Sequence, residues 1–128
     1  MWKSIVVICI GASCGALLRW WFGARLNAIF PAIPLGTFAA NMLGGYVIGA
    51  AIAFFPATAA LAPEWRLFIM TGFCGGLTTF STFSAEVATS IQAGQALWSC
   101  AEIMAHVGGS LLMTFAGMST VAWIRGAV

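Results

Sequence analysis

The chain has 128 residues, of which 62% are hydrophobic and only 6% are charged, and its formal net charge is +2. Soluble domains carry about 25% charged residues, so this composition excludes a soluble protein and indicates an integral membrane protein. The small net charge, with no basic stripe, excludes a nucleic-acid-binding protein. The length predicts one domain over residues 1–128.

Four apolar segments are long enough to cross a membrane as helices, because one span needs about 20 mostly apolar residues. They cover residues 4–24, 33–55, 65–91 and 97–124, with short breaks between them. The first segment looks like a signal peptide, but it continues through Leu18 without a clear cleavage site, so we expect a retained helix. The six tryptophans lie near the ends of the segments, as in an aromatic belt (Trp2, Trp20, Trp21, Trp65, Trp98 and Trp123).

The distribution of positive charge says little about how the chain inserts. Four spans place both termini on one side, and that side carries Lys3, Arg66 and Arg125. The other side carries Arg25, and also Arg19 if that residue reaches the interface. This bias is weak. Two possibilities stay open: the chain inserts one way, or it inserts both ways and can form an antiparallel dimer.

Glycines recur at a spacing of four residues in three of the segments (Gly11 and Gly15, Gly45 and Gly49, Gly72 and Gly76). Small residues at this spacing allow helix backbones to approach closely. The pattern predicts tight helix packing. A single four-helix bundle is too thin to enclose much, so we also expect an oligomer.

Three polar residues inside the segments are costly in a bilayer and therefore candidates for function. Arg19 either extends to the interface or faces inward, where it would give an anion a positive vestibule. Asn41 either links helices or donates its amide hydrogens to an anion. Glu86, in the second half of the third segment, indicates a hydrogen-bond or proton relay, or a pore wall.

The fourth segment carries two polar pairs, each with a spacing of four residues. Glu102 and His106 share a helix face, but two ligands do not make a metal site and nothing nearby supplies the rest. Ser110 and Thr114 either bond back to their own helix or form a polar track together with Asn41.

The stretch GLTTFSTFS, from Gly76 to Ser84, places five hydroxyls and two phenylalanines in a membrane segment. Glycines are poor helix formers and threonines can bond the backbone locally, so we expect a break between Gly75 and Thr79. Irregular backbone at membrane depth is tolerated only inside protein or beside water. Phe80 and Phe83 would then share one face, where they either pack in the core or turn their positive ring edges toward an anion.

Three stretches of the sequence resemble the Fluc (CrcB) family of fluoride ion channels. They are GASCGALLRW at residues 11–20, PLGTFAANMLG at residues 34–44 and GFCGGLTTFSTFSAE at residues 72–86. The third stretch is the most specific, and the resemblance covers essentially the whole chain.

The resemblance implies an all-α integral membrane protein with four transmembrane helices per subunit, the third broken in mid-membrane. It also implies an antiparallel, dual-topology homodimer in the lipid bilayer of the bacterial inner membrane, with two symmetry-related pores. The implied function is passive export of fluoride, which would reduce fluoride toxicity in the cytoplasm.

The resemblance also implies roles for particular residues. The positions that match the pore of the family are Asn41, Phe80, Phe83, Ser81, Thr82, Ser110, Thr114, Glu86 and Thr37. Arg19 matches its vestibule arginine. A structural sodium ion (Na+) at the dimer interface would be held by the backbone carbonyls of Gly75 and Thr78.

The nearest alternative is a proton-coupled small dual-topology exporter. Such proteins carry a coupling carboxylate in the first span, but here the first span has no acid, so Glu86 or Glu102 would have to replace it. A purely structural subunit would tolerate changes at Asn41, Phe80 and Phe83. An enzyme is not expected, because the sequence has no nucleophile elbow, metal cluster or phosphate loop.

Overall fold

The computed structural model describes residues 1–29, 34–57 and 62–126, and all regular structure in these residues is helical. The first two long helices are α1 (Trp2–Leu26) and α2 (Leu35–Phe54), and a short 3-10 turn, η1 (Phe55–Ala57), follows α2. The next part of the chain comprises α3 (Pro63–Arg66), the π-helical stretch η2 (Leu67–Cys74), α4 (Gly75–Leu77) and α5 (Phe80–Gln92). The last helix is α6 (Ala96–Ile124).

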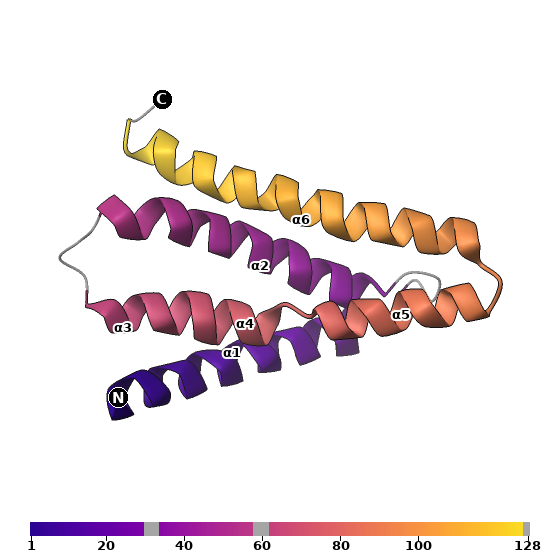
Figure 1. The fold of residues 1–128 in the computed structure, drawn as a ribbon, viewed down its shortest axis with the longest axis horizontal. Helices are drawn as coiled ribbons and strands as arrows, with labels where there is room; N and C mark the ends of the chain where they lie inside the picture. Colours follow the sequence, from indigo (N-terminus) through magenta and orange to yellow (C-terminus); the bar gives the residue numbers. More distant parts are fainter. Residues whose placement is uncertain (30–33, 58–61, 127–128) are drawn as a thin grey trace.

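Four helical stretches are long and apolar enough to cross a membrane: Trp2–Leu26, Leu35–Phe54, Pro63–Gln92 and Ala96–Ile124. The four spans expected from the sequence are therefore confirmed, with ends that differ by at most two residues. Residue 33, which the sequence prediction placed at the start of the second span, lies outside the described residues. The start of α1 and the end of α6 lie at the same end of the molecule (Figure 1).

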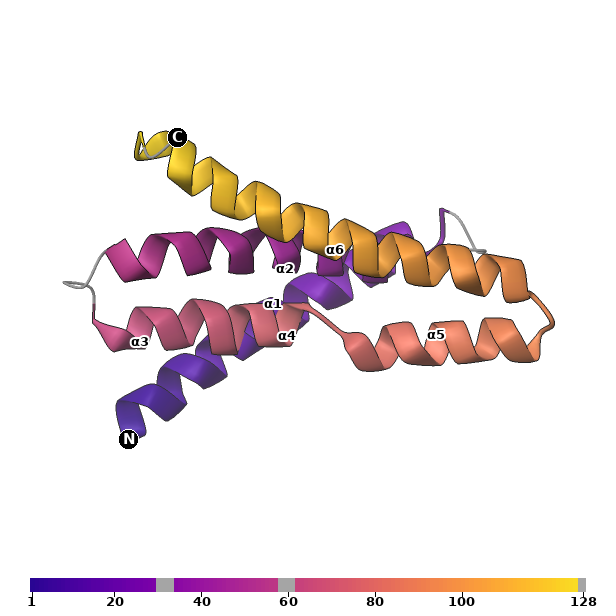
Figure 2. The same ribbon diagram turned by 45° about the horizontal axis from the view of Figure 1, so that its top comes forward.

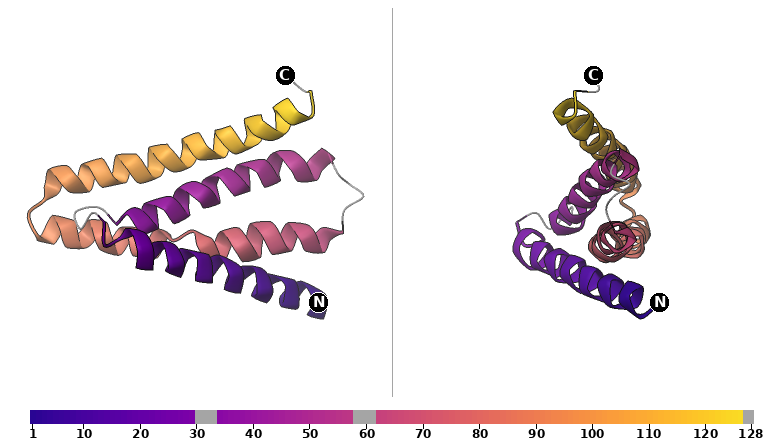
Figure 3. Two further views of the ribbon diagram at one scale, coloured as in Figure 1. Left: turned by 180° about the vertical axis from the view of Figure 1, so that it is seen from behind. Right: turned by 90° about the vertical axis from the view of Figure 1, so that its left-hand side faces the viewer.

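The helices form an open layer in which α6 and α1 lie at opposite edges (Figures 1 and 2). Helix α6 packs against α2 and α5, and α1 packs against α2, η2 and α4. The view along the helices shows that the layer is curved and does not close into a ring (Figure 3). One chain therefore leaves a broad face uncovered.

Glycines at the helix contacts explain the close approach of the backbones. A Cβ atom on Gly72 would lie 2.9 Å from the carbonyl oxygen of Ile8 and 3.0 Å from the Cα of Gly11. Between α2 and α6, a Cβ atom on Gly45 would lie 2.9 Å from the carbonyl oxygen of Ser110. These distances are too short for any side chain, so the tight packing predicted from the glycine spacing is confirmed.

Large apolar side chains point away from the chain along α6. Leu97 is 85% exposed, Met104 is 73% exposed and Leu112 is 72% exposed. An apolar surface of this extent is unsuited to water and fits lipid or a protein partner. The molecule is a multi-pass membrane protein.

Between α4 and α5 the backbone is extended at two residues. Thr78 has φ −78° and ψ 152°, and Thr79 has φ −148° and ψ 106°. The Thr79 hydroxyl oxygen accepts a hydrogen bond from the backbone N–H of Thr82 at 3.1 Å, so it caps the start of α5.

The glycine pair before these threonines is helical, although the sequence predicted that irregular backbone would begin at Gly75. Gly75 and Gly76 lie in α4. A Cβ atom on Gly76 would lie 2.9 Å from the Cα of Ala12 in α1. Gly76 therefore serves helix packing, and the backbone leaves the helical conformation only at the threonines.

Candidate functional site

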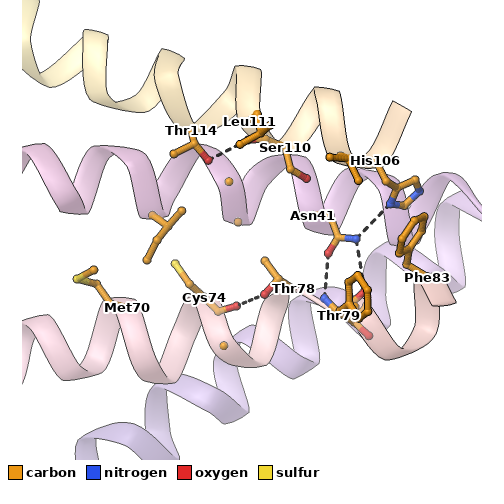
Figure 4. Close-up of a pocket in the computed structure, with 16 residues that line it drawn as sticks. Asn41, Met70, Cys74, Thr78, Thr79, Phe83, His106, Ser110, Leu111 and Thr114 are labelled. Atoms are coloured by element: carbon orange, nitrogen blue, oxygen red, sulfur yellow. Dashed lines mark hydrogen bonds between the residues drawn. The ribbon is translucent and has the colours of Figure 1, made fainter. Parts of the chain in front are cut away.

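The carboxamide of Asn41, in the middle of α2, holds the extended backbone in place (Figure 4). The backbone N–H of Thr79 donates to Asn41 Oδ1 at 2.9 Å. This bond fixes the orientation of the amide, because only its oxygen can accept. Asn41 Nδ2 then donates to the carbonyl oxygen of Thr79 at 3.5 Å and lies 3.2 Å from Nδ1 of His106 in α6. One side chain thus connects the interruption to α6.

His106 is enclosed by aromatic rings and is only 3% exposed. Phe83 stacks on it, with ring centroids 4.7 Å apart and an interplanar angle of 23°, and Phe38 meets it edge-on at 5.2 Å. Because Asn41 Nδ2 is a donor, His106 Nδ1 must accept, and the ring hydrogen belongs on Nε2.

Sequence reasoning missed the place of His106 in this site, because it weighed the residue only as a metal ligand beside Glu102. The usable signal was the spacing of four residues from His106 to Ser110 and from Ser110 to Thr114, which puts all three on one helix face.

The two phenylalanines of the hydroxyl-rich stretch have adjacent rings but different surroundings. Their centroids lie 5.8 Å apart at an interplanar angle of 60°. Phe83 is 7% exposed, whereas Phe80 is 77% exposed. Core packing within one chain therefore accounts for Phe83 and leaves Phe80 unexplained.

A cavity of about 560 Å³ lies beside the interruption (Figure 4). Its lining includes Asn41, Thr78, Thr79, Phe80, Phe83, His106, Ser110 and Thr114. The Thr114 hydroxyl donates to the carbonyl oxygen of Ser110 at 2.9 Å, so it bonds back to its own helix while it lines the cavity. The structure thus brings five of the sequence-predicted pore residues to one space: Asn41, Phe80, Phe83, Ser110 and Thr114.

A second cavity, of about 440 Å³, is lined by residues of α1, α2 and α5. Arg19 lines it and donates from Nε to the carbonyl oxygen of Gly76 at 3.2 Å, so the guanidinium faces inward. On the same cavity, the Thr37 hydroxyl donates to Glu86 Oε1 at 2.6 Å. Arg19, Thr37 and Glu86, three site residues implied by the resemblance, therefore share one space, and the hydrogen bond between Thr37 and Glu86 was not predicted.

Ser81 and Thr82, the other two predicted site residues, surround the cap of α5. The Thr79 hydroxyl donates to the Thr82 hydroxyl at 2.8 Å and lies 3.3 Å from that of Ser81. Ser81 is exposed, and Thr82 lines the second cavity.

A third cavity, of about 630 Å³, lies between α5 and α6. Glu86 and Glu102 both line it. Glu102 is only 6% exposed.

The interruption releases the backbone carbonyls of Gly75 and Thr78, among others, from helical hydrogen bonding. A continuous helix would direct the N–H of Thr79 to Gly75 and the N–H of Thr82 to Thr78. Instead, Thr79 N–H donates to Asn41 Oδ1 and Thr82 N–H donates to Thr79 Oγ1. A Cβ atom on Gly75 would meet nothing within 4 Å, so this side of the chain is open.

The freed carbonyls fit a cation, since unwound backbone carbonyls ligate sodium in transport proteins. Within residues 1–29, 34–57 and 62–126, no three His, Cys, Asp or Glu side chains gather to hold a metal. A cation in this part of the chain would therefore rely on the backbone.

Comparison with known proteins places the chain in context. A family model described as "CrcB-like protein, Camphor Resistance (CrcB)" matches residues 6–118. A protein of Pseudomonas paraeruginosa called "Fluoride-specific ion channel FluC" is 60% identical, with 98% of this chain and 99% of the relative covered. Relatives with the same description are 64% identical in Pseudomonas syringae pv. maculicola, over 92% of this chain and 93% of the relative, and 54% identical in Nitrosomonas europaea, over 98% of each.

Proposed function

The chain belongs to the CrcB-like protein family, and on this premise we propose that it forms a passive, fluoride-selective ion channel. The observation that carries the proposal is the joint position of the Asn41 carboxamide, the paired phenylalanines and the hydroxyls of α6 on one cavity. Its relatives carry the name "Fluoride-specific ion channel FluC". The protein conducts an ion and is not an enzyme. In the bacterial inner membrane it would let fluoride leave the cytoplasm and so reduce fluoride toxicity.

Fluoride is small and strongly hydrated, so a pore must replace its water with several donors at once. The Ser110 hydroxyl supplies such a donor on the cavity, and the Asn41 amide and the Thr114 hydroxyl would supply others by turning away from their present acceptors in the chain. The ring edges of Phe80 and Phe83 add a weak positive potential without a fixed cation. Weak, multiple contacts suit conduction, because an ion must leave as readily as it enters.

The path is completed by a second copy of the chain. Phe80 lines the cavity and is 77% exposed, and the helix layer leaves a broad face uncovered (Figure 3). A copy in antiparallel orientation would cover this face and bring its own Phe80 to the cavity. Twofold symmetry would then create two equivalent pores.

The same symmetry would give sodium a structural role. Each chain offers the carbonyl oxygens of Gly75 and Thr78. These oxygens are free because Asn41 and Thr79 accept the N–H groups that would bond them in a continuous helix. Two chains would offer four oxygens around one Na+ near the axis. The third transmembrane helix would thus be broken in mid-membrane both to hold this ion and to set Phe80 and Phe83 at the pore.

Arg19 and Glu86 would act on the approach to the pore. The guanidinium of Arg19 faces the second cavity and raises the local concentration of anions there. The Thr37 hydroxyl is bonded to Glu86 in this structure, and it could turn from the carboxylate to a passing fluoride ion.

Flux from liposomes tests this function against the proton-coupled alternative. Purified protein would be reconstituted with fluoride inside, the voltage dissipated with a potassium ionophore, and no proton gradient imposed. We expect fast fluoride release, and no release from matched liposomes that contain chloride. Release that requires a proton gradient would refute the channel and favour an exporter.

A further inference from the structure

Three buried side-chain atoms among the described residues have no hydrogen-bond partner, and they belong to neighbouring groups. They are Glu86 Oε2, Glu102 Oε1 and His106 Nε2. A buried polar atom without a partner is costly, particularly within a membrane. Glu86 and Glu102 share the cavity between α5 and α6, and His106 follows Glu102 by one turn of α6, so small side-chain rotations would bring the three atoms together.

The His106 atom is a donor. Thr79 N–H fixes the oxygen of Asn41, the nitrogen of Asn41 therefore faces His106 Nδ1, and Nδ1 must accept. The hydrogen on Nε2 then requires an acceptor. The other tautomer would place the Nδ1–H of His106 against the NH2 group of Asn41, which is also a donor. Turning the Asn41 amide over would remove this clash, but it would leave the Thr79 N–H without its acceptor.

Glu102 is the carboxyl placed to accept this hydrogen. It lies four residues before His106 on the same helix face, and helical side chains lean toward the preceding turn. The chain has only two other acids. Glu86 Oε1 is already bonded to Thr37, and Glu64 lies in α3, at the opposite end of the molecule from the turn between α5 and α6 (Figure 1).

We propose that Glu102 is a positioning residue of the pore, which accepts the Nε2–H of His106 and thereby keeps Nδ1 available to Asn41. The role rests on the proposed channel function. In its protonated form, Glu102 satisfies all three atoms: one oxygen accepts from His106, and the hydroxyl donates to Glu86 Oε2, directly or through one water molecule. An ionised Glu102 would offer Glu86 no hydrogen.

The ionisable groups that face Glu102 come from two helices. Glu86, on α5, lines the same cavity as Glu102, and His106 lies one turn further along α6. Helix α2 also packs on α6, but its one ionisable side chain, Tyr46, is bonded to Thr120 at 3.1 Å, near the other end of α6. The proposed chain of contacts is therefore Thr37–Glu86–Glu102–His106–Asn41.

The chain contains one histidine, so ¹⁵N-labelled histidine reports His106 alone in an NMR spectrum. We expect the wild type to show a protonated Nε2 and an unprotonated Nδ1. Glu102→Gln should preserve this spectrum and keep fluoride flux within about threefold of wild type, since its amide also offers one acceptor and one donor. Glu102→Leu should mix the tautomers or shift the Nε2–H signal, and lower flux about tenfold or more, because it removes the acceptor. Glu64→Gln is the matched control and should change neither.

Two results would overturn the assignment. An unchanged His106 spectrum in Glu102→Leu would show that Glu102 is not its partner. A changed spectrum with wild-type flux would show that the contact has no bearing on the pore. If Glu102→Leu does not fold, Glu102→Gln gives the test: a shifted His106 spectrum in this variant would show that a protonated Glu102 is not the acceptor of the Nε2–H. Absence of fluoride flux in the wild type would instead refute the channel function, and the spectra would still test the contact.

Discussion

Asn41 and Thr79 show how single side chains set the shape of the site. The Asn41 carboxamide accepts the hydrogen bond of the Thr79 N–H, which in a continuous helix would go to the carbonyl of Gly75. The Thr79 hydroxyl accepts that of the Thr82 N–H, which would go to the carbonyl of Thr78. Two ordinary hydrogen bonds thus open the helix, start α5 and point Asn41 Nδ2 at His106. The polar residues act as a connected set, so a change at one alters its neighbours.

The unequal burial of Phe80 and Phe83 leads to a prediction that separates conduction from folding. Phe80→Ile and Phe83→Ile should each nearly abolish fluoride flux from liposomes, because an aliphatic side chain has no positive ring edge. Phe83→Ile should also lower the melting temperature in detergent, since it loses the stacked contact with His106, worth about 0.5–1.5 kcal/mol. Phe80→Ile should leave the melting temperature of the dissociated chain unchanged. Wild-type flux from the double variant would contradict the role of the rings.

The helices themselves were largely predictable from the sequence, because hydropathy determines the spans and glycine spacing marks their contacts. The position of the irregular backbone depends on tertiary contacts. The sequence shows that Gly75 and Gly76 are poor helix formers, but only packing against Ala12 shows that Gly76 is needed within a helix. The contact of His106 with Asn41 was not predicted for a similar reason: the two residues lie 65 positions apart in the sequence, and no local pattern joins them.

Glycine contacts between α2 and α6 give a prediction for these elements. A Cβ atom on Gly49 would overlap the backbone of Thr114, lying 2.7 Å from its carbonyl carbon, whereas one on Gly108 would meet nothing within 4 Å. Gly49→Ala should therefore force the helices apart and lower the melting temperature in detergent. Gly108→Ala is the matched control and should be neutral or stabilising by up to about 1 kcal/mol. Equal melting temperatures for the two variants would show that the helices adjust freely at Gly49.

The molecule as a whole is an open layer with an apolar outer surface and little charge, and under the proposed function it would insert in both directions. Lys3, Arg66 and Arg125 on one side are opposed by Arg25 on the other, while Arg19 faces a cavity. An antiparallel pair of chains would cover the open face and close two pores.

A single reporter cysteine tests this topology. Ala93→Cys, in the exposed turn after α5, would be introduced into a chain whose four cysteines are replaced by alanine. In sealed inner-membrane vesicles, an impermeant maleimide should label half of the molecules, and the remainder only after permeabilisation. Ala40→Cys, at a fully buried position, is the control that should stay unlabelled. If all of the protein in intact vesicles is labelled, or none of it, the chain has a single orientation and the antiparallel dimer is excluded.

The reversal potential of a planar bilayer containing the protein tests the central claim most directly. Fluoride, chloride and protons would be given gradients of different size and direction, so that each ion predicts its own potential. A passive fluoride-selective channel requires that the current reverse at the fluoride equilibrium potential and remain there when either of the other gradients is changed. A potential that moves with the proton gradient, or with chloride, would contradict it.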